Sequence, residues 1–181
     1  MDDDDPSHPL THRRDGLYRL WIDDPATRDE IDRFDHEGHP DLRWGDYPKL
    51  LRKPSSRLYG AYIGDRLVAR MWLIVASNSE GLGRRPQLRL HLLEVLAGYR
   101  HLGLGSLLVR FSQRLGLPIA VDVLPGAEAF YLKLGFVPTD RTGKKRNHWG
   151  EQTFVWLPGQ PDAGQLSGPP TPQLAATVAQ G

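Results

Sequence analysis

The residues of this chain best suited to bind an anion are an arginine and two closely spaced glycines. They lie in the stretch Tyr99-Arg100-His101-Leu102-Gly103-Leu104-Gly105-Ser106. Residues 88–96 begin with alternating apolar positions and continue as an apolar run, which is typical of a strand that enters a core. Residues 104–115 place apolar side chains at helical spacing. Because the first turn of a helix presents unpaired N–H groups and glycine adds no Cβ, this junction predicts a pyrophosphate-binding loop.

One explanation of such a loop is the dinucleotide-binding unit of a Rossmann-type oxidoreductase. That unit places Gly-x-Gly-x-x-Gly directly after a strand and an acidic residue about 20 positions later. Asp122 follows Gly105 by 17 residues, close to this spacing. However, Leu108 occupies the place of the third glycine, and residues 97–102 separate the strand from Gly103. We therefore place this explanation behind a second one.

The second explanation accounts for more of the chain. Residues 95–105 resemble the acetyl-CoA loop of the GNAT N-acyltransferases, whose core signature is Arg or Gln, two residues, Gly, one residue, and Gly or Ala. Residues 129–136, Ala-Phe-Tyr-Leu-Lys-Leu-Gly-Phe, resemble the second GNAT signature. Ala97 stands where many members have Pro. The resemblance covers residues 88–138 and, by the order of elements, extends over residues 16–157.

The resemblance implies a fold and an activity. The fold is a three-layer α/β (α+β) domain with a central mixed, mostly antiparallel sheet that is splayed at the acetyl-CoA site and flanked by helices. The activity is transfer of an acetyl group from acetyl-CoA, as co-substrate, to a primary amine of a small molecule or peptide by direct attack. An alternative is a non-catalytic acyl-CoA-binding regulatory or interaction module.

The resemblance also implies which residues contact acetyl-CoA. Main-chain groups of the strand would bind pantetheine, and the glycine loop would bind the pyrophosphate with Arg100 adding charge. The other explanation for Arg100 is a surface arginine in a local ion pair. The implied cofactor-binding residues are Val95, Ala97, Arg100, His101, Leu102, Gly103, Leu104, Gly105 and Ser106.

Tyr131 matches the position at which many family members carry a tyrosine that protonates the departing thiolate. A phenol with a pKa of about 10 is protonated at neutral pH, so it can donate a proton to a thiolate whose thiol has a pKa of about 8.5. The alternative is an ordinary core aromatic beside Phe130.

The proton acceptor for the amine is a separate question. Glu94 and Asp122 lie in predicted central strands, where an unpaired carboxylate is costly. Strand alternation places Glu94 with Leu90 and Leu92, opposite His91 and Val95. We favour Glu94 slightly over Asp122, and His91 stays open as a third candidate. Each carboxylate could instead pair with an arginine of a neighbouring element.

Composition fits one catalytic domain. The chain has 181 residues, 39% hydrophobic and 25% charged, with 23 Lys and Arg against 22 Asp and Glu. This balance requires neither nucleic acid nor membrane as partner. There is no cysteine, and His36, His39 and Asp41 lack the spacing of two ligands one helical turn apart, so we expect no metal. A cytoplasmic location follows by default, and a homodimer stays open.

The order of elements is readable between two appendages. Residues 1–15 form an acidic segment that we expect to be mobile, residues 16–157 form the GNAT-like domain, and residues 158–181 have the Pro, Gly, Gln and Ala content of a disordered tail. Asp24 and Pro25 predict a helix start, and Gly64-Asp65 predicts a hairpin turn. The predicted order of strands and helices is β-α-α-β-β-β-α-β-α-β-β.

Overall fold

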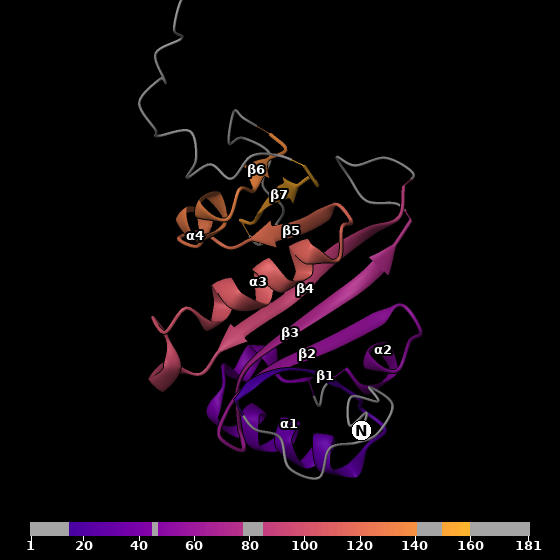
Figure 1. The fold of residues 1–181 in the computed structure, drawn as a ribbon, viewed down its shortest axis with the longest axis vertical. Helices are drawn as coiled ribbons and strands as arrows, with labels where there is room; N and C mark the ends of the chain where they lie inside the picture. Colours follow the sequence, from indigo (N-terminus) through magenta and orange to yellow (C-terminus); the bar gives the residue numbers. More distant parts are fainter. Residues whose placement is uncertain (1–14, 45–46, 78–84, 141–149, 160–181) are drawn as a thin grey trace, which may run out of the picture.

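The fold is an open sheet covered by helices on both faces (Figure 1). The computed structural model describes residues 15–44, 47–77, 85–140 and 150–159. The strands are β1 (Gly16–Leu20), β2 (Ser56–Ile63), β3 (Arg66–Ala76), β4 (Gln87–Val95), β5 (Ile119–Val123), β6 (Val137–Pro138) and β7 (Gln152–Trp156). The helices are α1 (Pro25–Glu37), α2 (Pro48–Leu51), α3 (Leu104–Arg114) and α4 (Glu128–Lys133), with 3-10 turns η1 (Pro40–Leu42) and η3 (Ala97–Tyr99).

The described strands form one mixed, mostly antiparallel sheet in the order β1-β2-β3-β4-β5-β7-β6. β4 and β5 run parallel, and the other described neighbours run antiparallel. This confirms the predicted fold class and order of elements. The dinucleotide-binding explanation is wrong, because a doubly wound fold needs a mostly parallel sheet.

Local signals explain where several elements begin. The Asp24 carboxylate accepts hydrogen bonds from the backbone N–H and the hydroxyl of Thr27, so it caps α1 as predicted. The Gly64-Asp65 turn joins β2 and β3, and Gly64 adopts a positive φ of 57°. The apolar run of β3 is buried along most of its length, as expected for a strand covered on both faces.

Two apolar clusters fill the space above and below the sheet. One cluster includes Leu108 of α3 and Tyr131 of α4, and the other includes Phe34 of α1 and Leu51 of α2. Helices α3 and α4 therefore cover one face, and α1 and α2 cover the other. In Figure 1, α3 lies along β4, which it contacts.

A β-bulge in β4 changes which face its side chains occupy. Trp72 of β3 pairs with Leu92, whereas the next residue of β3 pairs with Leu90, so the register passes over His91. Leu90 consequently packs under α3 and α4, while Leu92 packs under α1 and α2. Simple alternation, which put Leu90 and Leu92 on one face and His91 opposite Glu94, is wrong here because a bulge adds one residue to one strand only.

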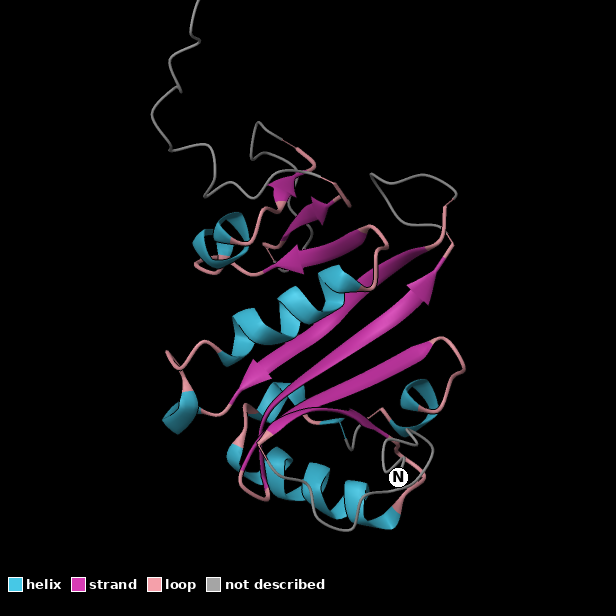
Figure 2. Cartoon of the chain, in the orientation of Figure 1, coloured by secondary structure: helices cyan, strands magenta, loops and turns pink. Residues whose placement is uncertain are grey.

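The sheet opens next to this bulge. Pairing between β4 and β5 covers Leu88 to Leu90 and ends there. Figure 2 shows the two strands diverging towards their carboxyl ends. The sheet is therefore splayed where the glycine loop follows β4, as the resemblance implied.

The two predicted appendages lie almost entirely outside the described residues, so the boundaries at residues 15 and 158 stay predictions. Within the described ranges, no helix is long and apolar enough to cross a membrane.

Candidate active site

The glycine loop runs over the surface and ends at the first turn of α3. Gly103 has a φ of 81° and directly precedes the helix, and His101 also has a positive φ, of 67°. His101 and Leu102 are exposed, and Leu104, Gly105 and Ser106 are half-buried. A left-handed residue before a helix turns the chain so that the first N–H groups of the helix are accessible to an anion.

Gly105 is the point at which the loop, β4 and α4 come together. A Cβ at this position would lie 3.4 Å from Cζ of Phe130 and 3.7 Å from Cγ2 of Val95. Val95 and Phe130 also pack against the apolar cluster that contains Tyr131, so the predicted phosphate loop, the predicted pantetheine strand and the predicted proton donor lie around one cluster. The structure brings together three sets of residues that are up to 36 positions apart, from Val95 to Tyr131.

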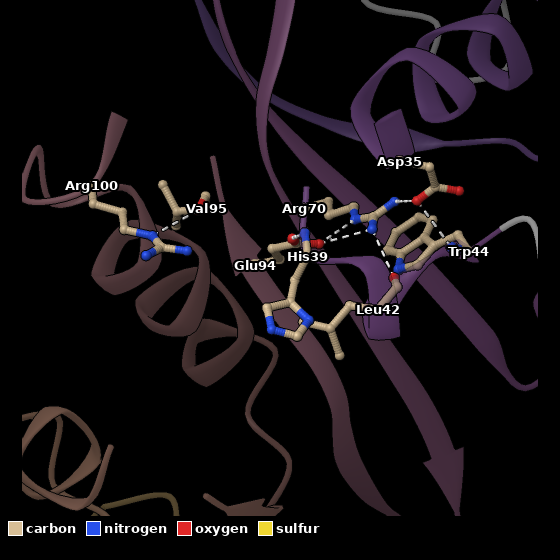
Figure 3. A network of polar contacts seen from close by, with 8 residues as sticks. All are labelled: Asp35, His39, Leu42, Trp44, Arg70, Glu94, Val95 and Arg100. Carbon is tan, nitrogen blue, oxygen red and sulfur yellow. Dashed lines mark hydrogen bonds and ion pairs between the residues drawn. The ribbon is translucent and has the colours of Figure 1, made fainter. Parts of the chain in front are cut away.

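Arg100 lies on the surface and donates from Nε to the main-chain oxygen of Val95 at 3.3 Å (Figure 3). The bond is long and exposed, so the guanidinium is easily redirected. Ala97 opens the turn η3 between β4 and Arg100, and it is exposed.

Tyr131 is buried among aromatic side chains. Its ring lies edge-on to Phe130 and Phe136, with ring centroids 5.0 Å and 5.5 Å away. Burial raises the pKa of the Tyr131 phenol well above its ordinary value of 10. The group therefore holds its proton across the whole neutral range.

Glu94 is part of a buried ion network centred on Arg70. Arg70 donates to one oxygen of Glu94 from Nε at 3.1 Å and from Nη2 at 2.8 Å, and the backbone N–H of His39 donates to the other oxygen. Arg70 also pairs with Asp35 and donates to the main-chain oxygen of Leu42 at 2.7 Å. Figure 3 shows this network beside the strand that leads to Val95 and Arg100. Both oxygens of Glu94 are thus engaged by protein groups.

Asp122 is held in a similar way on the neighbouring strand β5. One oxygen pairs with Arg89, and the other accepts a hydrogen bond from the hydroxyl of Thr153 at 2.8 Å. A proton taken up by Glu94 or Asp122 would weaken one of these contacts. The ion pairs with arginines of neighbouring strands are the alternative that the sequence left open for both carboxylates.

His91 lies on the same face of the sheet as Glu94. Its ring packs edge-on against Trp72, with centroids 4.5 Å apart, and the residue is nevertheless exposed. Partial burial lowers the pKa of His91 below 6.5; Arg89 lowers it further, and Asp122 and Glu151 oppose the shift. The neutral imidazole, with a free lone pair, is the form expected at pH 7.

Sequence reasoning missed Arg70. The signal was present, because Arg70 is a charged residue in the middle of the apolar run 67–75. It is fully buried, and its guanidinium lies over the rings of Phe34 and Trp44 at 4.3 Å and 4.9 Å. No cluster of three or more metal-ligating side chains lies within the described part of the chain; the structure does not describe the side chain of Asp41.

Comparison with known proteins decides the family. The acetyltransferase (GNAT) family matches residues 14–136 of this sequence, more than half of the chain. The chain belongs to this family. An uncharacterized N-acetyltransferase of Shouchella clausii is 36% identical over 138 residues, which cover 73% of this chain and 82% of the relative.

Solved structures agree with this assignment. The N-acetyltransferase YlbP of Bacillus subtilis, crystallised in complex with coenzyme A, superposes with a TM-score of 0.58 at 29% identity and covers 80% of this chain and 97% of its own. The ribosomal-protein-S18-alanine N-acetyltransferase of Escherichia coli, at 14% identity and a TM-score of 0.54, covers 78% of this chain and 90% of its own. This second likeness shows the shared fold alone.

Proposed function

We propose that this GNAT protein transfers the acetyl group of acetyl-CoA to a primary amine of a small molecule or peptide by direct attack of the amine. The observation that carries the proposal is the opening of the sheet after Leu90, on the strand whose last residue, Val95, lies beside Gly105 at the start of α3. A strand that leaves its neighbour exposes main-chain groups to a ligand. The coenzyme A complex of the similar YlbP supports the same choice of co-substrate.

In this proposal the loop and strand bind acetyl-CoA. The N–H groups of residues 102–106 and the guanidinium of Arg100 neutralise the pyrophosphate, and Val95 and Ala97 fix the pantetheine arm. The space beside Gly103 is open, since a Cβ there would meet no atom within 4 Å. The residues present therefore fit a phosphate-bearing ligand.

Tyr131 protonates the thiolate in the proposed reaction. The amine nitrogen forms a bond to the acetyl carbon, the carbon–sulfur bond breaks, and the sulfur leaves with the electron pair. The buried phenol holds its proton at neutral pH and is placed next to Phe130, which touches the Gly105 region. Proton donation to the leaving group is worth about 10²–10⁴-fold in rate.

Thermal unfolding with acetyl-CoA, coenzyme A and NADH tests the binding half of the proposal. A ligand at 100 times its Kd adds about 2.7 kcal/mol of stability, or several degrees in Tm. We expect both CoA ligands, and not NADH, to raise the Tm. Gly105→Glu places a carboxylate at the proposed phosphate site and should abolish the shift, while Leu115→Glu, at the far end of α3, should keep it.

The Tm of each variant without ligand shows whether it folds. No shift with any CoA ligand on a folded wild-type protein would overturn the proposal. A shift without acetyl transfer to any amine would favour the non-catalytic acyl-CoA-binding module instead.

A further inference from the structure

The bulge in β4 places a histidine at the mouth of the opened sheet. His91 is the extra residue between Leu90, where pairing with β5 ends, and Leu92, where pairing with β3 resumes. Bulges bend a strand and re-aim a side chain, and they are frequent beside active sites. Here the bulge coincides with the divergence of β4 from β5.

The ring of His91 packs against one rigid aromatic neighbour, and the residue is still exposed. Trp72 packs against the ring, and Trp72 itself is fully buried and anchored by a hydrogen bond from Nε1 to Ser56 Oγ at 3.2 Å. A rigid neighbour of this kind limits the rotamers of the imidazole. Through its contact with Trp72, His91 lies on the face of the sheet that α1 and α2 cover, and Tyr131 belongs to the cluster on the other face.

The carboxylates nearby are already engaged. Glu94 is held by Arg70 and the backbone of His39, and Asp122 by Arg89 and Thr153. Of the three proton acceptors that the sequence left open, His91 is the one that contacts an aromatic ring rather than an arginine. Its lone pair can accept a proton without disrupting an ion pair.

We propose that His91 accepts the proton that the acceptor ammonium must lose before its nitrogen can attack. This role rests on the proposed acetyltransferase function. It supplies the proton acceptor for the ammonium, which the proposed reaction did not yet name. Two protons leave the nitrogen in the full reaction. His91 takes the first proton and passes it to solvent. The second proton is lost to solvent when the amide forms. Tyr131 gives its own proton to the thiolate and is then reprotonated from solvent. One proton is released for each amide formed.

The charges around His91 set the direction of the pH dependence. Burial and Arg89 lower the pKa of His91 below 6.5, whereas Asp122 and Glu151 oppose this shift. A base works in its neutral form, so activity should persist on lowering the pH to 6.5 and fall only below it. The fall of kcat/KM at acidic pH in the wild-type protein should therefore reflect protonation of the His91 imidazole.

The test measures coenzyme A release with saturating acetyl-CoA and a panel of polyamines, aminoglycosides and peptides with free amino termini. The chain contains no cysteine, so a thiol reagent detects only the released coenzyme A. We expect His91→Gln to lower kcat/KM by about 10²–10⁴-fold and to remove the acidic limb. The Kd for acetyl-CoA should stay unchanged, and His36→Gln, a matched change of an exposed histidine on α1, should behave as wild type.

A base role and a structural role give different results with His91→Ala. Added imidazole should restore part of the rate if the missing group is a base, and it should do nothing if the side chain only supports Trp72. Wild-type activity in His91→Gln, an unchanged acidic limb, or a lack of rescue overturns the assignment. A wild-type chain that binds acetyl-CoA and acetylates no amine overturns the proposed function, and the role of His91 with it.

Discussion

Arg70 donates two hydrogen bonds to a single oxygen of Glu94, from Nε at 3.1 Å and from Nη2 at 2.8 Å. The pair lies on adjacent strands, because Arg70 of β3 is registered directly against Glu94 of β4. Asp35 of α1 and the carbonyl of Leu42 after it bind the rest of the guanidinium. Arg70 thus ties the segment after α1 to the strand that ends in the glycine loop.

Removal of Arg70 should destabilise the protein strongly. Arg70→Met leaves Glu94 and Asp35 buried without their shared cation, and we expect the free energy of unfolding to fall by about 3–5 kcal/mol. Urea denaturation measures this. Arg66→Met, which breaks an exposed pair with Glu37, should cost about 1 kcal/mol or less.

A milder variant guards against failure to fold. Arg70→Lys keeps the charge and loses the fork of donors, so it should fall between Arg70→Met and wild type. Equal stability of Arg70→Met and wild type would show that the network contributes nothing.

Gly38 should tolerate no side chain, for a reason unrelated to backbone conformation. Its φ of −79° suits any residue, but a Cβ would lie 2.7 Å from Oε1 of Glu94 and 3.1 Å from the carbonyl of Phe34. We expect Gly38→Ala to lower the free energy of unfolding by about 1–3 kcal/mol. Gly98→Ala is the matched control, since a Cβ there meets no atom within 4 Å; equal effects would contradict this view of the network.

Arg100 should act in cofactor binding rather than in stability. Its hydrogen bond to the main-chain oxygen of Val95 is exposed and long. A charge-assisted hydrogen bond is worth about 1.5–3 kcal/mol, so Arg100→Ala should raise the Kd for coenzyme A by about 10–100-fold. Calorimetric titration measures this Kd. With dephospho-CoA, which lacks the 3′-phosphate, Arg100→Ala should raise the Kd by the same factor if Arg100 binds the pyrophosphate. The factor should be smaller only if Arg100 binds the 3′-phosphate. Arg114→Ala, at the far end of α3, should leave the Kd unchanged.

Tyr131→Phe should separate chemistry from binding. The change removes one hydroxyl from a packed aromatic cluster, so the Kd for acetyl-CoA should hold while kcat falls by about 10²–10⁴-fold. Because burial raises the pKa of the phenol above 10, loss of its proton should produce no alkaline limb up to pH 10. An alkaline limb of kcat below pH 10 that disappears in Tyr131→Phe would contradict this assignment. Tyr59→Phe, on β2, is the control and should keep the wild-type kcat.

The sequence predicted the elements well because their signals are local. Asp24 caps α1, Gly64 turns the β2–β3 hairpin, and the apolar run of β3 has the length of a fully covered strand. The glycines of the loop likewise predicted the start of α3. Each of these features depends on a few consecutive residues.

The site was harder to predict because it depends on register between strands. Alternation placed His91 and Glu94 on opposite faces of the sheet, whereas the bulge places them on the same face. The extra residue on β4 is apparent only from the pairing of β4 with Trp72 and its neighbour on β3. The partners of Glu94 are likewise distant: Arg70 is 24 positions away and His39 is 55. A lone chain gives no register between strands that far apart.

Acetyl transfer itself is measured most directly with isotope-labelled acetyl-CoA and the amine panel, followed by mass spectrometry of the acceptor and quantification of free coenzyme A. We expect labelled amide and free coenzyme A in equal amounts with wild type, and neither with Gly105→Glu. Release of coenzyme A without labelled amide, or no release from a protein that binds acetyl-CoA, would contradict the assignment of this chain as an amine acetyltransferase.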